Sequence, residues 1–326
     1  MPAEVSTEML VPPREPVNFM GSEIGAESVT DLLSDAQGHF ETGQWEQARE
    51  KVHQASRLAA TLTADLRGQR LAVRAWRMEA ELMRAQGQYG GAERKLHRVI
   101  KLAEAWFGSE DAAVGRCLNA LGIVYRYTGR NDDALTCYER ALVILAQAGE
   151  AVGEAVVLHN LAGLYFALGQ LDEAEKAVRK ALEMRLVWAP ESALAIAADR
   201  LCLAAILTQA GNSEARMHAE SALQSYREHH GSEHVEVGYC LQVLGHISAT
   251  SDADHETARA LFAEALKVKK GTLGPLHPEL LPTLLSLITL SNGSSRVALV
   301  QEALRIAALL PKTHPLKQRC LKLTST

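Results

Sequence analysis

The sequence predicts an all-α fold made of about seven helical hairpins stacked as a solenoid. The first observation is composition: 47% of the 326 residues are hydrophobic but only 5% are aromatic, and Ala and Leu, both strong helix formers, dominate. The second is periodicity, because apolar residues recur at intervals of three and four, as at Leu118, Leu121 and Val124, and no segment shows the alternation of a strand. The third is an internal repeat.

The repeat is clearest in the middle of the chain. Residues 118–142, LNALGIVYRYTGRNDDALTCYERAL, align without a gap with residues 158–182, LHNLAGLYFALGQLDEAEKAVRKAL. Glycines coincide at Gly129 and Gly169, between two amphipathic segments of each copy. Each copy is therefore predicted to be a helix, a short turn and a second helix.

Small residues mark the other copies in order along the chain. A pair of them seven positions apart recurs in the predicted second helices. The pairs are Ala48 and Ala55, Ala92 and Val99, Ala134 and Ala141, Ala174 and Ala181, Ala215 and Ala222, and Ala258 and Ala265, followed by Ala303 alone. Breakers such as Ala189-Pro190 and Gly274-Pro275 separate copies. This count gives about seven hairpins.

Gly122 shows what the small residues do. It lies inside a predicted helix, where glycine costs up to about 1 kcal/mol relative to alanine. A missing side chain on the packed face lets two helix axes approach closely. We therefore expect Gly122 and Ala134 to lie where the two helices of one hairpin cross.

The pattern resembles the tetratricopeptide repeat, which has Leu, a small residue, Tyr, Ala, an aromatic residue and Ala at fixed positions. The third copy supplies Leu121, Gly122, Tyr125, Ala134, Tyr138 and Ala141. The second copy departs from the pattern at Glu79 and Met83. The repeat is longer than usual and is similar to the kinesin light chain type, which "GTLGPLHPELLPTLLSL" also resembles.

The resemblance implies a right-handed superhelix over residues 27–312. Residues 1–26 contain four prolines and scattered Glu, a composition that favours a disordered tail. An alternative is that this tail docks onto the superhelix of its own chain. Residues 313–326 are expected to be a C-terminal tail or capping segment.

Composition excludes several functional classes. A net charge of −5 argues against a general nucleic-acid binder, which needs a basic surface. No apolar run reaches the roughly 20 residues of a membrane span, and the N-terminus is unlike a secretory signal. Five cysteines without a C-x-x-C pair indicate buried thiols in a reducing compartment. We expect a cytoplasmic protein with no membrane or nucleic-acid partner.

The sequence contains no recognisable catalytic, cofactor or metal motif. Phosphate-binding loops, the nucleophile elbow and H-E-x-x-H are absent. The cluster His229, His230 and His234 spans a Gly-Ser break between copies, which is typical of an exposed junction rather than a metal site. Cys117 and His159 occupy different repeat positions, so a nucleophile and base pair is not indicated. We predict no catalysis, no cofactor and no metal.

In the tetratricopeptide family, certain positions of each first helix line a concave groove. Carried over residue by residue, the resemblance implies a binding site made of Arg74, Arg77, Arg84, Arg116, Asn119, Arg126, Tyr127, His159, Asn160 and Phe166. Arginine binds carboxylates through two parallel hydrogen bonds, and an Asn amide can pair with a peptide backbone. The alternative is that these arginines are solvated and balance nearby acids.

The charge is distributed unevenly. Residues 1–62 carry ten Asp and Glu against four Lys and Arg, whereas residues 63–130 carry twelve basic against seven acidic residues. A positive field is therefore expected over the second and third copies. The sequence predicts a non-catalytic scaffold or adaptor that binds an extended, acidic segment of another protein. Two alternatives stay open: a regulator gated by a peptide or small molecule, and a permanent subunit of a larger assembly.

Overall fold

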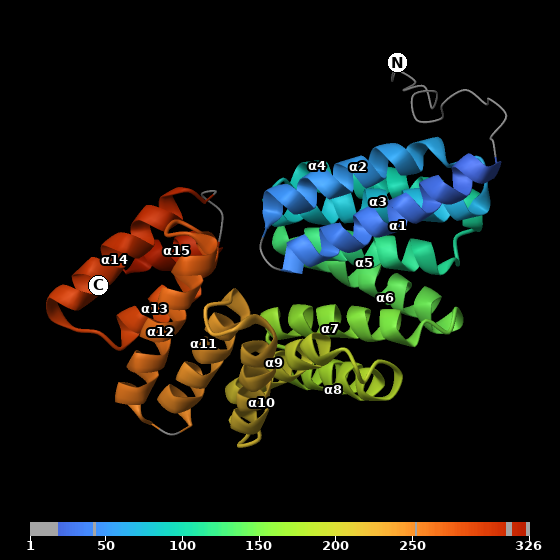
Figure 1. The fold of residues 1–326 in the computed structure, drawn as a ribbon. Coiled ribbons are helices and arrows are strands. Elements are labelled where there is room, and N and C mark those ends of the chain that lie inside the picture. Colours follow the sequence, from blue (N-terminus) through green and yellow to red (C-terminus); the bar gives the residue numbers. More distant parts are fainter. Residues whose placement is uncertain (1–18, 42–43, 252, 311–314, 324–326) are drawn as a thin grey trace, which may run out of the picture. The chain divides into compact units, whose positions relative to one another are not determined.

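The protein is described by a computed structural model that covers residues 19–41, 44–251, 253–310 and 315–323. These residues form fifteen α-helices and one short 3-10 helix, and none of them lies in a strand. The chain divides into two compact units, one up to Leu164 and one from Tyr165 onward. The prediction of an all-α solenoid of about seven helical hairpins is confirmed (Figure 1).

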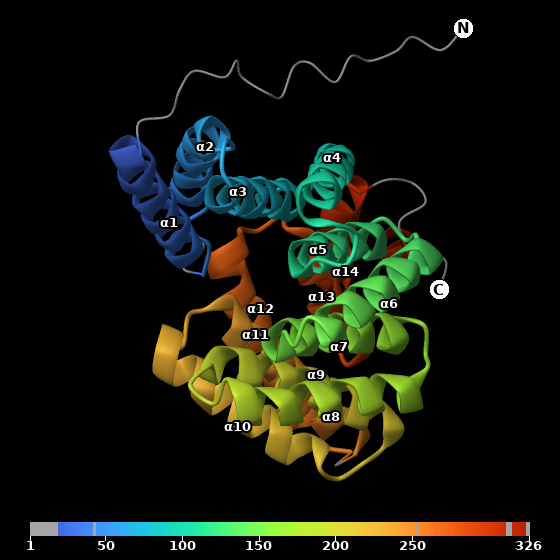
Figure 2. The ribbon, with the colours of Figure 1, turned by 90° about the vertical axis from the view of Figure 1, so that its right-hand side faces the viewer.

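The helices of the first unit follow one another as hairpins in sequence order (Figure 2). They are α1 (Phe19–Glu41), α2 (Trp45–Thr61), α3 (Leu66–Ala85), α4 (Tyr89–Phe107), α5 (Ala112–Tyr127), α6 (Asn131–Gln147) and α7 (Ala151–Ala167), whose last turn passes into the second unit. Contacts join consecutive helices from α1 to α6, and they also join α1 to α3 and α3 to α5. The first helices of successive hairpins therefore lie side by side.

The second unit repeats this arrangement. Its helices are α8 (Leu171–Trp188), α9 (Ala193–Ala210), α10 (Ala215–His230), α11 (Val235–Thr250), α12 (His255–Leu273), η2 (Pro278–Leu280), α13 (Leu281–Thr289), α14 (Gly293–Ala308) and α15 (Pro315–Lys322). Here too the first helices α9 and α11 contact each other.

The turns within several hairpins depend on a glycine. Gly129 has φ +78°, a left-handed conformation that other residues rarely adopt. It allows the N–H of Arg130 to reach the carbonyl oxygen of Tyr125 at 2.9 Å, which ends α5 in a Schellman motif. Gly169 has φ +76°, and the N–H of Gln170 bonds the carbonyl of Tyr165 at 2.9 Å in the same way. The predicted turns are confirmed at both positions.

Gly122 lies at the crossing of α5 and α6, as its sequence position predicted. A Cβ atom on Gly122 would lie 2.6 Å from Cε1 of Tyr138, which is fully buried. The second unit has an equivalent contact, since a Cβ on Gly245 would lie 2.7 Å from Cε1 of Phe262. Each glycine makes room for an aromatic ring of the paired helix.

We expect Gly122→Ala to destabilise the protein by about 1–3 kcal/mol, because the Tyr138 ring must leave its packed position. Gly38→Ala is the matched control: Gly38 also lies in a helix, α1, but a Cβ atom added there would meet no neighbouring atom within 4 Å. This control should be neutral or stabilising by up to about 1 kcal/mol. Urea unfolding of both variants measures the difference, and equal stabilities would contradict the crossing.

Helices extend into both terminal segments that the sequence analysis set apart from the repeats. α1 begins at Phe19, so residues 19–26 are helical and the repeat region starts before residue 27. The rest of the predicted tail, residues 1–18, lies outside the described residues. At the other end, α15 packs on α13 and α14, and its Cys320 is fully buried in a cluster with Leu284 and Ile306. This part of the C-terminal segment covers the last hairpin.

Helix α9 is the one described helix whose length and composition would suit a membrane span. It packs between α8 and α10, and it carries Asp199, which is fully buried. Nε of Arg185 on α8 donates to Oδ2 of Asp199 at 2.6 Å. The apolar side chains of α9 are thus explained by packing between helices around a buried ion pair.

Candidate functional site

None of the ten predicted site residues belongs to the core. Arg74 and Tyr127 are exposed, and the others are half-buried. Nine of them lie on α3, α5 and the part of α7 before Tyr165, all in the first unit. We call the surface formed by these three helices the first-helix face. The tenth residue, Phe166, lies on α7 beyond Leu164 and belongs to the second unit.

Two of the predicted residues bond directly to each other. Nδ2 of Asn160 on α7 donates to Oδ1 of Asn119 on α5 at 2.9 Å. Each amide keeps further hydrogen-bonding capacity, since one N–H of Asn160 and one lone pair of Asn119 are used. The two amides therefore link α5 and α7 across the first-helix face, and they keep hydrogen-bonding capacity for a ligand.

A groove of about 770 Å³ lies between α3 and α5. Its lining contains five arginines, four apolar residues and no acidic residue: Leu66, Arg67, Arg70, Leu71, Val73, Arg74, Arg77, Ala113 and Arg116. We call it the arginine groove. Three of the predicted residues, Arg74, Arg77 and Arg116, are among its lining residues. Arg67 and Arg70 were missed, because they precede the positions that the family motif marks.

Three arginines of the groove are already paired within the chain. Arg70 binds Asp111 through two bonds, Nη1–Oδ1 at 3.1 Å and Nη2–Oδ2 at 2.9 Å, which hold the pKa of Asp111 below its usual value. Arg77 forms an ion pair with Glu81 one turn along α3, and this charge raises the pKa of Arg77.

Arg116 is the third paired arginine, with Nη1 lying 3.1 Å from Oε2 of Glu150. For Arg77 and Arg116, these ion pairs agree with the alternative that the arginines balance nearby acids. Neither can bind an external carboxylate without competing with a carboxylate of its own chain.

Arg74, in contrast, is not paired with a carboxylate of the described residues. Among the described residues it has no hydrogen bond or ion pair with an acid, and its neighbours Arg77 and Arg116 carry the same charge. Although Arg74 is exposed as a residue, partial desolvation of its guanidinium lowers its pKa, and the two like charges lower it further. An anion bound beside Arg74 would relieve this repulsion.

The remaining predicted arginines, Arg84 and Arg126, lie at the other end of α3 and α5. Their guanidinium carbons lie 5.2 and 5.4 Å from the centre of the Tyr127 ring. Neither has an acidic partner among the described residues. The structure thus brings Arg84, Arg126 and Tyr127 together, as a cluster separate from the arginine groove.

The second unit has its own polar row between first helices. The hydroxyl of Tyr239 on α11 donates to Oε2 of Glu279 at 3.4 Å, and the hydroxyl of Thr283 on α13 donates to Oε1 of Gln242 at 2.5 Å. Nζ of Lys269, a residue only 1% exposed, donates to Gln242 at 2.6 Å and to Thr283 at 3.2 Å. Sequence reasoning missed this row, because Lys269 lies on a second helix.

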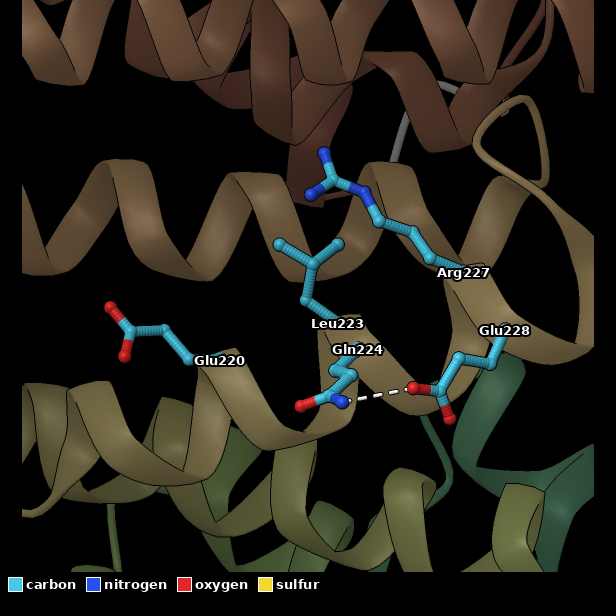
Figure 3. Close-up of a pocket in the computed structure, with 5 residues that line it drawn as sticks. All are labelled: Glu220, Leu223, Gln224, Arg227 and Glu228. Carbon is cyan, nitrogen blue, oxygen red and sulfur yellow. Dashed lines mark hydrogen bonds between the residues drawn. The ribbon is translucent and has the colours of Figure 1, made fainter.

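A further hollow lies on the surface of α10 (Figure 3). Its lining residues Glu220, Leu223, Gln224, Arg227 and Glu228 all come from that one helix. The amide of Gln224 donates to Glu228 at 2.9 Å, and Arg227 lies 3.7 Å from Glu264 of α12. Its polar groups are already paired, so this hollow offers no converging set of ligand-binding groups.

The cysteines and histidines do not form a reactive site in the described part of the chain. Burial raises the pKa of the Cys117 and Cys240 thiols to about 12, so both stay protonated and unreactive near neutral pH. His230 and His234 stack on each other at 4.2 Å. No group of three or more His, Cys, Asp or Glu side chains among the described residues could hold a metal ion.

The fold and the exposed first-helix face together define a helical-repeat solenoid. Residues 71–147 and 124–186 match the sequence profile of the tetratricopeptide repeat family. Residues 71–186 are tetratricopeptide repeats, as the sequence motifs predicted. No curated protein matches the chain.

Solved structures show the same fold at low sequence identity. BtubC (BKLC) from P. vanneervenii is 21% identical over 72% of this chain and 94% of its own, with a TM-score of 0.57. A Rap protein complexed with competence and sporulation factor is 14% identical over 88% of this chain and 77% of its own, with a TM-score of 0.67. The quorum sensor NprR from B. thuringiensis is 16% identical over 91% and 81%, with a TM-score of 0.63.

Proposed function

We propose that the protein is a non-catalytic scaffold or adaptor that binds an extended, acidic segment of a partner protein on its first-helix face. The observation that carries this proposal is the arginine groove, which has five arginines and no acidic lining residue. Within it, Arg67 and Arg74 have no acidic partner among the described residues. They supply two positive charges that internal ion pairs leave uncompensated.

The binding mode follows from the chemistry of the face. Carboxylates of the segment pair with Arg67 and Arg74, while Leu66 and Leu71 contact its apolar side chains. The Asn119 and Asn160 amides pair with its main-chain N–H and C=O groups. Arg77 and Arg116 contribute mainly to the field, because Glu81 and Glu150 already neutralise them.

Several features support the absence of catalysis. The Cys117 and Cys240 thiols are buried and protonated, and the charged side chains of the groove are guanidinium groups, which stay protonated near neutral pH and cannot act as general bases. We also expect the protein to be cytoplasmic, without a nucleic-acid or membrane partner, because its net charge is negative and its apolar helices pack against other helices.

The test uses two labelled peptides of about 12 residues, one alternating Glu and Ala and one alternating Gln and Ala. We expect the native protein to bind the Glu peptide and not the Gln peptide, and added salt to weaken this binding. The double variant Arg67→Gln/Arg74→Gln should lose about tenfold in affinity, because two charge-assisted contacts disappear. Fluorescence anisotropy at two salt concentrations gives both quantities.

Arg140→Gln is the matched control, because Arg140 lies on α6, outside the arginine groove, and pairs with Glu104. It removes one positive charge and should leave the affinity nearly unchanged. If the groove variant also bound as tightly as the native protein, with the fold intact by circular dichroism, the arginine groove would not be the binding site.

Two other functions, a regulator gated by a peptide and a permanent subunit of a larger assembly, are each supported by one observation. Structures of the same fold include the Rap protein with competence and sporulation factor and NprR with its cognate peptide NprX, which favours a regulator gated by a peptide. Such a regulator should change its radius of gyration when the Glu peptide binds. A permanent subunit would use exposed apolar side chains, such as Val187 (64% exposed) and Trp188 (66%) at the end of α8.

A further inference from the structure

Arg84 and Arg126 are two uncompensated cations held close together. They lie near the C-terminal ends of neighbouring first helices, α3 and α5. Nε of each is buried and has no hydrogen-bond partner among the described residues. Elsewhere in the first unit, Arg70, Arg116 and Arg140 each pair with a carboxylate. Arg84 and Arg126, like Arg67 and Arg74 of the arginine groove, have no such carboxylate among the described residues.

Tyr127 and Tyr89 hold the two guanidinium groups in place. Both guanidinium carbons lie within 5.4 Å of the Tyr127 ring centre, where the ring quadrupole attracts cations. Tyr89 stacks on Tyr127 with ring centres 5.9 Å apart and ring planes 16° from parallel. This aromatic pair orients the arginines without neutralising them, so their full charge faces whatever binds there.

A third polar group lies on α6, the helix that packs against α5. The hydroxyl of Tyr138 is buried and has no hydrogen-bond partner among the described residues. Burial raises the pKa of this hydroxyl, while the positive charges of Arg126 and Arg84 lower it, which places it within their electrostatic reach. These three groups are thus donors with bonding capacity to spare in one region.

Gly163 on α7 completes the site from the third helix. A Cβ at position 163 would lie 2.8 Å from Nη1 of Arg126. The guanidinium of Arg126 therefore lies against the backbone of α7. It occupies the space that a side chain at position 163 would fill if that residue were not glycine. Because the atom that would clash is the far end of a flexible side chain, an alanine there displaces the guanidinium and leaves the helices in place.

We propose that Arg84, Arg126, Tyr127 and Gly163 form a binding site for a phosphate group. Two uncompensated guanidinium groups match the two charges of one phosphate monoester, whose oxygens accept several arginine hydrogen bonds at once. A single carboxylate would neutralise only one of the two charges. The chemistry fits a phosphorylated side chain of a partner and a free phosphate ester alike.

This inference rests on the proposed function and deepens it, because the arginine groove and the proposed phosphate site both lie on the first-helix face. Arg74 and Arg84 are ten residues apart on α3, as are Arg116 and Arg126 on α5. Ten helical residues span about 15 Å, the length of four to five residues of extended peptide. A segment that occupied both the arginine groove and the phosphate site would therefore carry its phosphate about four to five residues from its carboxylates.

The first experiment measures inorganic phosphate and acetate binding to the full chain by isothermal titration calorimetry. We expect phosphate to bind at least tenfold more tightly than acetate. The double variant Arg84→Gln/Arg126→Gln should lose at least tenfold in phosphate affinity. Gly163→Ala should lose about threefold or more while its urea unfolding midpoint does not fall. Arg140→Gln should bind phosphate like the native protein.

A second arm distinguishes the two sources of phosphate. A short peptide with one phosphoserine is compared with free phosphate. An affinity at least tenfold higher for the peptide assigns the site to a phosphorylated partner, whereas equal affinities assign it to a free phosphate ester. The proposal is overturned if acetate binds as tightly as phosphate, or if the double variant keeps native affinity. Failure of the acidic-peptide test leaves these measurements intact, because they involve neither Arg67 nor Arg74.

Discussion

Replacing Arg185 by Met should destabilise the protein by about 3–5 kcal/mol, the largest effect we expect from a single substitution. The Asp199 side chain is fully buried, and Nε of Arg185 donates to it at 2.6 Å. Removal of the cation leaves a carboxylate inside the α8–α9 packing with its main counter-charge gone. The cost of an unpaired buried charge exceeds that of nearly any lost surface contact.

The double variant Arg185→Met/Asp199→Leu is the control for this prediction. It removes both charges and keeps side chains of similar size, so it should recover most of the lost stability. Urea unfolding followed by circular dichroism gives the three free energies. If Arg185→Met cost less than about 1 kcal/mol, the pair would be solvated and α9 would lack the buried ion pair described above.

The second large effect concerns Lys269 and depends on pH. Burial lowers the pKa of its amino group to about 8, while Glu279 and Glu236 raise it by smaller amounts. The unfolded chain has the ordinary value of 10.5, so between the two values it binds more protons than the folded chain. The stability gained from the neutral amine is therefore full above about 10.5 and is lost as pH falls through about 8.

Lys269→Met isolates this contribution, because other titrating groups are common to both proteins. The stability of the native protein relative to the variant should rise by about 2 to 3 kcal/mol between about pH 7.5 and about pH 10. Denaturant unfolding of both proteins at several pH values gives the difference. A flat difference across this range would mean that the amine titrates normally and is solvated.

The local features of the fold were predictable from sequence. Gly129 marks a turn because only a left-handed residue ends a helix that way, and Gly122 marks a helix crossing because its position is fixed by the repeat. Both depend on residues within one hairpin. The start of α1 at Phe19 was missed, since helix propensity there is weak and packing against α2 stabilises the helix.

The candidate site was predictable in outline only. The repeat register placed nine of the ten predicted residues on the first-helix face. The partner of Arg77 could have been found, since Glu81 lies four residues along the same helix. The partner of Arg116 could not, because Glu150 lies in the next hairpin and meets it only after the hairpins stack. Gly163 likewise acquires its role from Arg126 of the preceding hairpin.

Within each unit, packing links helices that are neighbours or near neighbours in the sequence. A hairpin that leaves the ribosome can therefore dock at once on the hairpin before it, without waiting for distant parts of the chain. Synthesis then extends the folded array step by step in the direction of translation. The cluster of Leu284 and Ile306 stays open until α15 is made, and burial of Cys320 then closes that cluster.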